Sequence, residues 1–238
     1  NGTPACRRAR TAGDIGVSLT RQYYLRVVAV RDGSPAAKAG LRTGDYLRII
    51  NERPTRDMSV WEGDRLLRGA PGTTVKLTVI RGNAAEPHIV DVAREVLPPL
   101  PLSSRMVADG IGYVRVAEMG DDVPAALGNE LTRLARDGAR SVILDLRGCG
   151  RGSLATGLEA ARLFVASGTV GQLETRGEDR QVIAAVPGDG AVTVPVEVLV
   201  DFGTTGAAEL FAAALSGNTR AELVGEPTGG RAAVQRLF

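Results

Sequence analysis

The chain has 238 residues, of which 44% are hydrophobic and 24% charged, and its formal net charge is +2 at pH 7. This length suits one or two globular domains, and so small a net charge gives no electrostatic reason to bind nucleic acid. No apolar run approaches the roughly 18 residues that a membrane-spanning helix needs, so no integral membrane segment is expected.

The first half of the chain has the pattern of a small β-rich domain with two helices. Residues 1–14 lack the apolar core of a signal peptide. Ser34 followed by Pro35 is typical of a helix start, and Ser59 is expected to begin a second helix. The expected strands cover residues 14–19, 24–30, 46–50 after a Gly44-Asp45 turn, and 72–82, where Val75, Leu77 and Val79 alternate on one face.

A proline-rich stretch at residues 95–104 is predicted to be a linker, because its prolines resist both helix and central strand. After it, strands alternate with helices, an order typical of a largely parallel sheet flanked by helices. The apolar run "SVILDLRG" indicates a strand in a sheet that is covered on both faces. Helices are expected at 121–138 with an acidic N-cap, at 153–168 between Ser153 and Gly168, and at 204–217.

The stretch "VEVLVDFGTTGAAELF" predicts a buried strand, a sharp turn and a helix, the geometry that presents a nucleophile in many hydrolases. Its turn contains no serine or cysteine. Thr204 and Thr205 carry the only hydroxyl groups, and neither has a lysine or histidine base nearby in the sequence. The turn therefore has the shape of a nucleophile site without the expected nucleophile.

The rarer side chains exclude several kinds of chemistry. Cys6 and Cys149 match no metal-ligand spacing, and the single histidine, His88, lies in a strand-like run. We therefore predict no metal, no other cofactor and no Ser-His-Asp triad. The 29 basic residues include two lysines, Lys38 and Lys76, so the second half of the chain offers no lysine as a general base.

The turn, short helix, Gly-Asp turn and strand within Gly33–Asn51 resemble a bacterial-type PDZ domain. Together with "GIGYVRVAEM", "SVILDLRG" and the 201–209 turn, the chain from residue 14 to 238 resembles the carboxyl-terminal processing peptidases, or tail-specific proteases. The resemblance implies an α/β protein: a PDZ domain, which is a small β-rich barrel with two helices, joined to an α/β core related to the crotonase-like/ClpP fold. The implied divisions are an N-terminal segment (1–13), the PDZ domain (14–94), the linker (95–104) and a core (105–238) that we expect to continue beyond the given sequence.

The resemblance also implies an activity, cleavage of proteins near the C-terminus by a Ser-Lys dyad assisted by a glutamine, outside the cytoplasm. The three family positions are occupied by Gly206, Arg231 and Gln235. The oxyanion-hole positions fall on Ala207, Arg151 and Gly152, within a "DLRGCGRGS" loop that lacks the family's Asn-Pro-Gly portion.

These departures predict loss of the dyad chemistry. Glycine cannot form an acyl-enzyme, and an arginine stays protonated beyond about pH 12 and offers no lone pair as a base. Two interpretations of Arg231 stay open. It binds a carboxylate together with the N-terminus of the following helix, or it pairs with Glu209 or Glu226, which are otherwise expected, like Asp145, in turn and cap roles.

The PDZ resemblance predicts a peptide-binding groove, in which an extended peptide adds a strand and backbone N–H groups hold its terminal carboxylate. The groove residues implied are Ile15, Gly16, Val17 and Leu19. Trp61 and Arg65 of the following helix either face the groove, or Trp61 makes a core or interdomain contact.

Three functions are compatible with these features. The first is a catalytically impaired relative that binds protein C-termini or unfolded polypeptide through its PDZ domain. The second is an active serine-type peptidase with a non-standard nucleophile. The third is a scaffold that pairs with an active homologue, and a homo-oligomer is also open. Family resemblance places the protein outside the cytoplasm, periplasmic or secreted.

Overall fold

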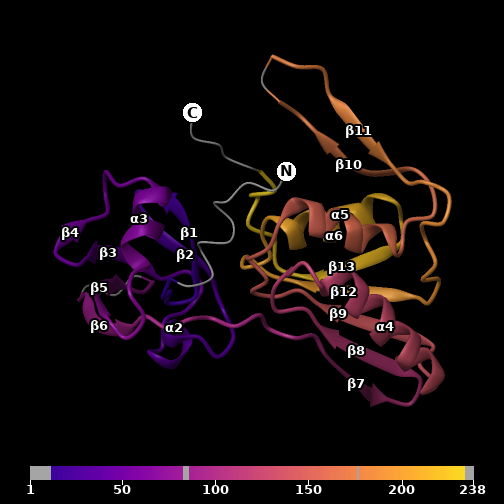
Figure 1. The fold of residues 1–238 in the computed structure, drawn as a ribbon, viewed down its shortest axis with the longest axis horizontal. Helices are drawn as coiled ribbons and strands as arrows, with labels where there is room; N and C mark the ends of the chain where they lie inside the picture. The colour runs from indigo at the N-terminus through magenta and orange to yellow at the C-terminus, as the bar shows by residue number, and fades with distance from the viewer. Residues whose placement is uncertain (1–11, 83–85, 176, 234–238) are drawn as a thin grey trace. The chain divides into compact units, whose positions relative to one another are not determined.

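The computed structural model describes residues 12–82, 86–175 and 177–233, and the chain divides into two compact units, residues 1–99 and 100–238 (Figure 1). Each unit has its own cluster of buried apolar side chains. None of the helices in the described ranges is long and apolar enough to cross a bilayer.

The first unit is an antiparallel sheet with two short helices, as the sequence predicts. The strands follow the order β1-β2-β3-β5-β6, and β4 pairs with β3. The elements are β1 (Val17–Gln22), β2 (Tyr24–Val30), α2 (Pro35–Lys38), β3 (Tyr46–Ile50), β4 (Arg53–Pro54), α3 (Val60–Leu67), β5 (Thr74–Ile80) and β6 (His88–Ala93).

The helix starts predicted in this unit are confirmed. The Ser34 hydroxyl accepts the N–H of Ala37 and caps α2, with Pro35 as the first helical residue. Ser59 and Glu62 form a reciprocal capping box at the start of α3. On β5, Val75, Leu77 and Val79 are fully buried in the core of the unit, as their alternation predicts.

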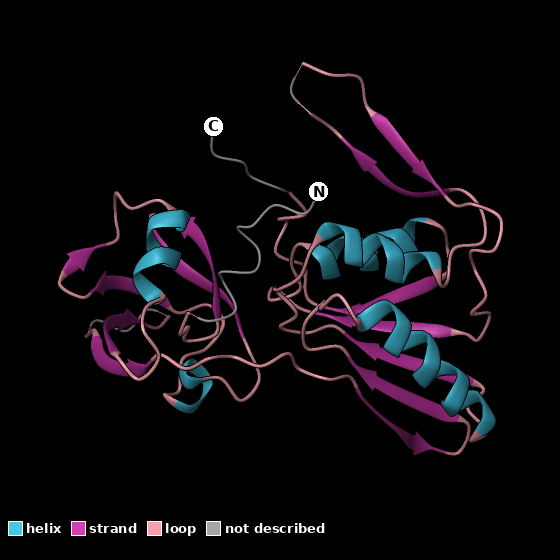
Figure 2. Cartoon of the chain, in the orientation of Figure 1, coloured by secondary structure: helices cyan, strands magenta, loops and turns pink. Residues whose placement is uncertain are grey.

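The second unit contains a five-stranded sheet in the order β13-β12-β9-β8-β7 (Figure 2). All neighbours pair in parallel except β7, which is antiparallel to β8, so the prediction of a largely parallel sheet is confirmed. The elements are β7 (Ser103–Ala108), β8 (Ile111–Arg115), α4 (Val123–Arg136), β9 (Ser141–Asp145), α5 (Leu154–Arg162), β10 (Thr169–Leu173), β11 (Gln181–Ala184), β12 (Val196–Val200), α6 (Ala207–Gly217) and β13 (Ala221–Gly225).

Several local predictions in this unit need correction. Strand β7 begins at Ser103, inside the predicted linker, because Ser103 and Ser104 pair with β8. Helix α5 ends at Arg162, well before Gly168. Asp122 is at the N-cap position of α4, but its side chain makes no capping hydrogen bond. The β10–β11 hairpin, which extends from the rest of the unit in Figure 2, was not predicted from the sequence.

The two faces of this sheet differ in burial, contrary to the expectation of two covered faces. Val142 and Leu144 of β9 belong to the buried cluster that includes apolar side chains of α4, α5 and α6. Ile143 points to the other face and is only partly buried, and further along the sheet Glu197 of β12 and Val224 of β13 are exposed. The continuous apolar run was misleading because all three helices pack against the same set of side chains.

Candidate functional site

Three loops that follow parallel strands meet at the carboxyl edge of the sheet in the second unit. The loop after β9 joins the turn after β12 through a hydrogen bond from the N–H of Gly148 to Asp201 Oδ1, 2.8 Å. The N–H of Thr205 donates to the carbonyl of Cys149, 3.1 Å, and the N–H of Gly229, after β13, donates to the carbonyl of Thr204, 3.1 Å. This edge of a parallel sheet is where α/β proteins place their ligand sites.

Gly206 lies in an unusual backbone conformation at the turn between β12 and α6. It is the N-cap of α6 with φ 61° and ψ −117°, a region that residues with a side chain rarely adopt. A Cβ built on Gly206 would have no heavy atom within 4 Å other than those of its chain neighbours. The turn therefore leaves open space at residue 206, in a backbone conformation that a side chain would occupy only with strain.

The two threonines that precede Gly206, Thr204 and Thr205, are both buried. The Thr204 hydroxyl is fully buried, donates toward the carbonyl of Leu146 at 3.0 Å and accepts the N–H of Asp201 at 3.1 Å. Thr205 is 5% exposed, and its methyl group lies where a side chain at Gly229 would be. Because Thr204 is committed to tying the turn to the preceding loop, it is not placed to attack a substrate.

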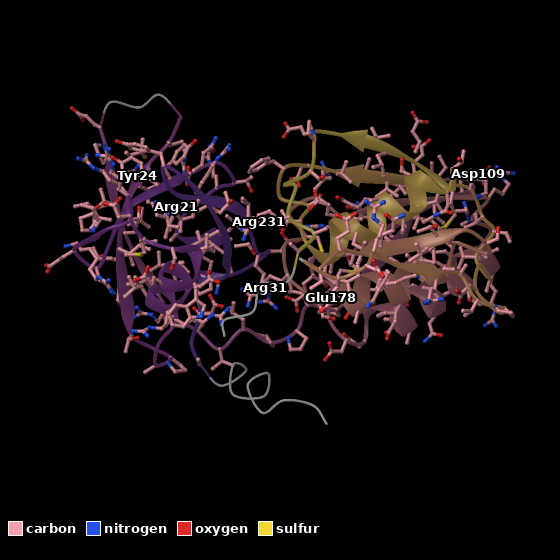
Figure 3. All side chains as sticks on the ribbon, turned by 90° about the horizontal axis from the view of Figure 1, so that it is seen from above. Arg21, Tyr24, Arg31, Asp109, Glu178 and Arg231 are labelled. Atoms are coloured by element: carbon pink, nitrogen blue, oxygen red, sulfur yellow. The ribbon has the colours of Figure 1, made fainter. Side chains whose placement is uncertain are left out.

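Glu209, in the first turn of α6, holds the segment that follows β13. Its carboxylate accepts the hydroxyl of Thr228 at 2.5 Å, the N–H of Gly230 at 2.6 Å and the N–H of Arg231 at 2.6 Å. The structure thus brings Arg231 (labelled in Figure 3) beside the helix that Gly206 begins. The contact between Glu209 and Arg231 runs through the main chain of Arg231. Gln235 lies outside the described residues.

Replacing Glu209 by alanine should loosen this segment. Loss of the two main-chain acceptor contacts is expected to raise the hydrogen-exchange rates of the Gly230 and Arg231 amides at least about tenfold. The amide of Gly229 is an internal control, since it bonds to Thr204 and should change less. Exchange followed by NMR tests this, with the exposed Glu222→Ala as matched variant; unchanged protection at both amides would contradict the assigned role.

The predicted oxyanion-hole residues occupy two separate elements of the same edge. Arg151 and Gly152 run beside Met119, whose N–H donates to the Arg151 carbonyl at 2.8 Å. Gly152 has φ 133°, and a Cβ there would lie 2.3 Å from the Met119 carbonyl oxygen, so this position requires glycine. Ala207 is the first residue of α6, where main-chain N–H groups have no partner within the helix.

Asp145 organises the start of the loop after β9. Its carboxylate receives the guanidinium of Arg147 at 2.7 and 2.9 Å and the hydroxyl of Tyr113 at 2.7 Å. Burial alone would raise the pKa of Asp145, but the hydrogen bonds from Arg147 and Tyr113 outweigh it and lower that pKa to about 2. Burial and the same hydrogen bond raise the pKa of Tyr113. Asp145 is therefore held as an anion that orients a loop, which is a structural role of the kind expected from the sequence.

This pKa predicts acid sensitivity. A carboxylate whose pKa is lowered by folding stabilises the native state above its unfolded pKa, near 4, and that stabilisation disappears as the pH falls through about 2. The contribution is of order 2 kcal/mol at neutral pH. Urea unfolding at a series of pH values should show the decline between pH 4 and 2. In Asp145→Asn the decline should be smaller, and an identical pH profile in the variant would contradict the assignment.

The residues predicted for the peptide groove of the first unit lie in and just before β1 and on α3, and their side chains are placed differently from the expectation. Ile15, Val17 and Leu19 are buried. Gly63 is the close contact of α3, since a Cβ there would lie 3.2 Å from Leu19 Cδ1 and 2.3 Å from Leu25 Cδ1.

Trp61 and Arg65 point away from this contact. They stand about 200° from Gly63 around a helix of 3.6 residues per turn. Trp61 is 58% exposed, and the Arg65 guanidinium stacks over its ring at 5.3 Å. The expectation that both face the groove is therefore corrected, as is the core alternative for so exposed a tryptophan, while the interdomain alternative stays a prediction.

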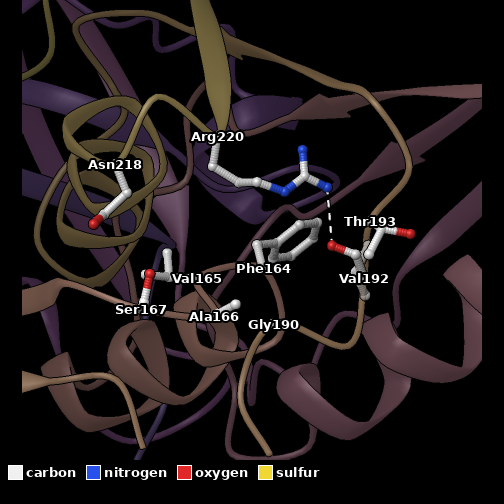
Figure 4. A pocket seen from close by; sticks show the side chains of 9 residues that line it. All are labelled: Phe164, Val165, Ala166, Ser167, Gly190, Val192, Thr193, Asn218 and Arg220. Atoms are coloured by element: carbon white, nitrogen blue, oxygen red, sulfur yellow. Dashed lines mark hydrogen bonds between the residues drawn. The ribbon is translucent and has the colours of Figure 1, made fainter.

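A cavity of about 360 Å³ lies elsewhere in the second unit (Figure 4). Arg220 stacks over the ring of Phe164 at 5.8 Å and donates to the carbonyls of Val192 and Val194, at 2.9 and 2.5 Å. These residues precede β12 and β13, so the cavity is at the amino ends of the parallel strands. It is thus at the opposite end of the sheet from the Gly206 turn and forms no part of that site.

Comparisons with known proteins agree with this architecture. A family model described as Peptidase family S41 matches residues 110–238, more than half of the chain, and one described as PDZ domain matches residues 26–81. The solved structure of a photosystem II D1 C-terminal processing protease has a TM-score of 0.85 at 24% identity, covering 95% of this chain and 64% of that one. The predicted fold, a PDZ β-sheet domain joined to a mixed α/β core, is confirmed.

Curated relatives share more sequence. The chain is 31% identical over 218 residues to a carboxyl-terminal-processing protease of Synechocystis sp., which covers 90% of this chain and 51% of the relative. It is 32% identical over 210 residues to the carboxy-terminal processing protease CtpA of Bacillus subtilis, with 88% and 45% covered. The chain spans about half the length of these relatives.

Proposed function

The chain belongs to peptidase family S41 and carries a PDZ domain, and from this premise we propose that it binds polypeptide without cleaving it by Ser-Lys chemistry. The ligands are unfolded chains or protein C-termini, held by the PDZ groove. The observation that carries the proposal is the Gly206 turn, which has open space at residue 206 but no nucleophile.

The chemistry around the turn supports the loss of activity. Losing the nucleophile of a coupled catalytic unit costs about 10⁶-fold in rate, and losing its base as well adds little. At the lysine position, Arg231 offers five N–H donors and no lone pair for accepting a proton. The nearest alternative hydroxyl, that of Thr204, is buried and hydrogen-bonded within the turn.

Incubation with a permanently unfolded polypeptide, such as a reduced and alkylated protein, tests the proposal. We expect saturable binding by titration calorimetry and no new fragments by mass spectrometry. Turnover that Thr204→Ala or Thr205→Ala abolishes would contradict it and would favour a peptidase with a non-standard nucleophile. Absence of binding to any unfolded chain would contradict the ligand class.

A further inference from the structure

The loop Gly13–Gly16, just before β1, is where a PDZ domain offers main-chain N–H groups to the terminal carboxylate of a peptide. Gly16 has φ 83°, and consecutive N–H groups around such a left-handed residue form an anion-binding concavity. A Cβ on Gly16 would lie 2.4 Å from Ser34 Cβ, so the loop is closely packed and its donors are fixed in position.

Three of the donors in this loop already have partners within the chain. The N–H of Gly13 donates to the carbonyl of Gly69 at 2.7 Å, and the N–H of Asp14 donates to the carbonyl of Glu95 at 2.9 Å. The N–H of Gly16 donates to the side-chain carboxylate of Asp14, at 3.0 Å from Oδ1. A carboxylate is therefore present at the loop, and it belongs to the protein.

Asp14 also forms an ion pair with Arg68, the cation that such a site would offer to the carboxylate of a ligand. Its Oδ2 lies 3.6 Å from Nε of Arg68, and the residue is 9% exposed. A second carboxylate arriving here would meet a like charge in a largely desolvated position, which disfavours it, as repulsive elements in specific binding sites do.

We infer that Asp14 makes the groove select internal segments of a polypeptide over free C-termini, because its carboxylate occupies the position of the terminal one. The inference rests on the proposed function and narrows its ligand class.

The experiment compares one unstructured peptide of about ten residues in two forms, with a free C-terminal carboxylate and with a C-terminal amide. Calorimetry on the full chain is expected to show that the amide binds at least as tightly as the acid. In Asp14→Ala, which frees the Gly16 N–H and Arg68, the acid should bind about tenfold more tightly than the amide. Asp14→Asn keeps the acceptor without the charge and should fall between the two.

Two further variants separate charge at the loop from general effects. Asp91→Asn, an exposed carboxylate on β6, should leave the ratio of acid to amide affinity at its wild-type value. Arg68→Ala in the Asp14→Ala background should lower the gained preference for the acid. Thermal unfolding followed by the fluorescence of Trp61, the single tryptophan, checks that each variant is folded.

The possible results separate a failure of the role inferred for Asp14 from a failure of the proposed polypeptide binding. If the wild-type chain binds the acid about tenfold more tightly than the amide, the inference is wrong and peptide binding stands. If folded Asp14→Ala gains no preference for the acid, the inference is equally wrong. If neither form binds either the wild-type chain or Asp14→Ala, the proposed function falls and the inference with it.

Discussion

The double variant Gly206→Ser/Arg231→Lys is expected to react with a fluorophosphonate probe at least about a thousandfold faster than the wild-type chain. The serine would project from a turn that already has φ 61° and no heavy atom near its Cβ apart from its chain neighbours. The lysine would stand on a segment whose main chain Glu209 holds beside α6, and unlike arginine it can give up its proton. Mass spectrometry of the labelled chain measures both the rate and the modified residue.

Single variants identify which change limits the reaction. Gly206→Ala imposes the same unfavourable backbone region without a nucleophile, a cost of about 1–3 kcal/mol in stability, and should not be labelled. Arg231→Lys alone should also stay unlabelled, while Gly206→Ser alone should react slowly for lack of a base. Labelling of the wild-type chain at the rate of the double variant would contradict the proposal that the site is inactive. So would a double variant as stable as Gly206→Ala that remains unlabelled.

Gly157→Ala is expected to destabilise the second unit by about 1–2 kcal/mol, because an overpacking cost of about 1–3 kcal/mol exceeds the gain of about 1 kcal/mol that alanine ordinarily gives in a helix. A Cβ on Gly157 in α5 would lie 2.4 Å from the carbonyl oxygen of Ala207 at the start of α6. The obstacle is main chain and cannot rotate away, so one of the two helices must shift.

Gly128 provides the matched control, since it lies inside α4 and a Cβ there would meet nothing closer than 3.8 Å. Gly128→Ala should therefore stabilise the protein by up to about 1 kcal/mol. Urea unfolding of both variants measures the difference, and equal stabilisation by the two substitutions would contradict the close approach of α5 and α6. A shift of α6 would also affect the candidate site, because Ala207 directly follows Gly206.

The parts of the fold that could be predicted are those set by neighbours in sequence. Ser34 and Ser59 cap helices through N–H groups three residues away, so their signal is complete within one turn. The alternation of strand and helix after residue 105 likewise predicts the parallel sheet from the order of neighbouring elements. It also brought the loops bearing Gly206 and Arg231 to one edge.

What escaped prediction depends on contacts between distant residues. The Glu209 contacts span up to 22 residues, and carboxylate acceptors of main-chain N–H groups leave no sequence pattern at that distance. The β10–β11 hairpin has exposed apolar residues such as Leu173 and Val182 and no tight-turn signature. For α3 the sequence does contain a signal, because Gly63 and Leu67, four residues apart, mark the buried face and so place Trp61 on the other.

The way Glu209 contacts the chain has a consequence for how this family can change. At Gly230 and Arg231 it recognises main-chain N–H groups, which every residue except proline provides. The contact of Glu209 with the N–H of residue 231 therefore does not depend on which side chain that residue carries, proline excepted. Selection can therefore act separately on the shape of the loop and on the chemistry of the side chain at residue 231. A lineage can in this way lose a reaction without losing the fold on which the reaction took place. The same separation makes residue 231 a suitable place for a genetically encoded non-natural side chain.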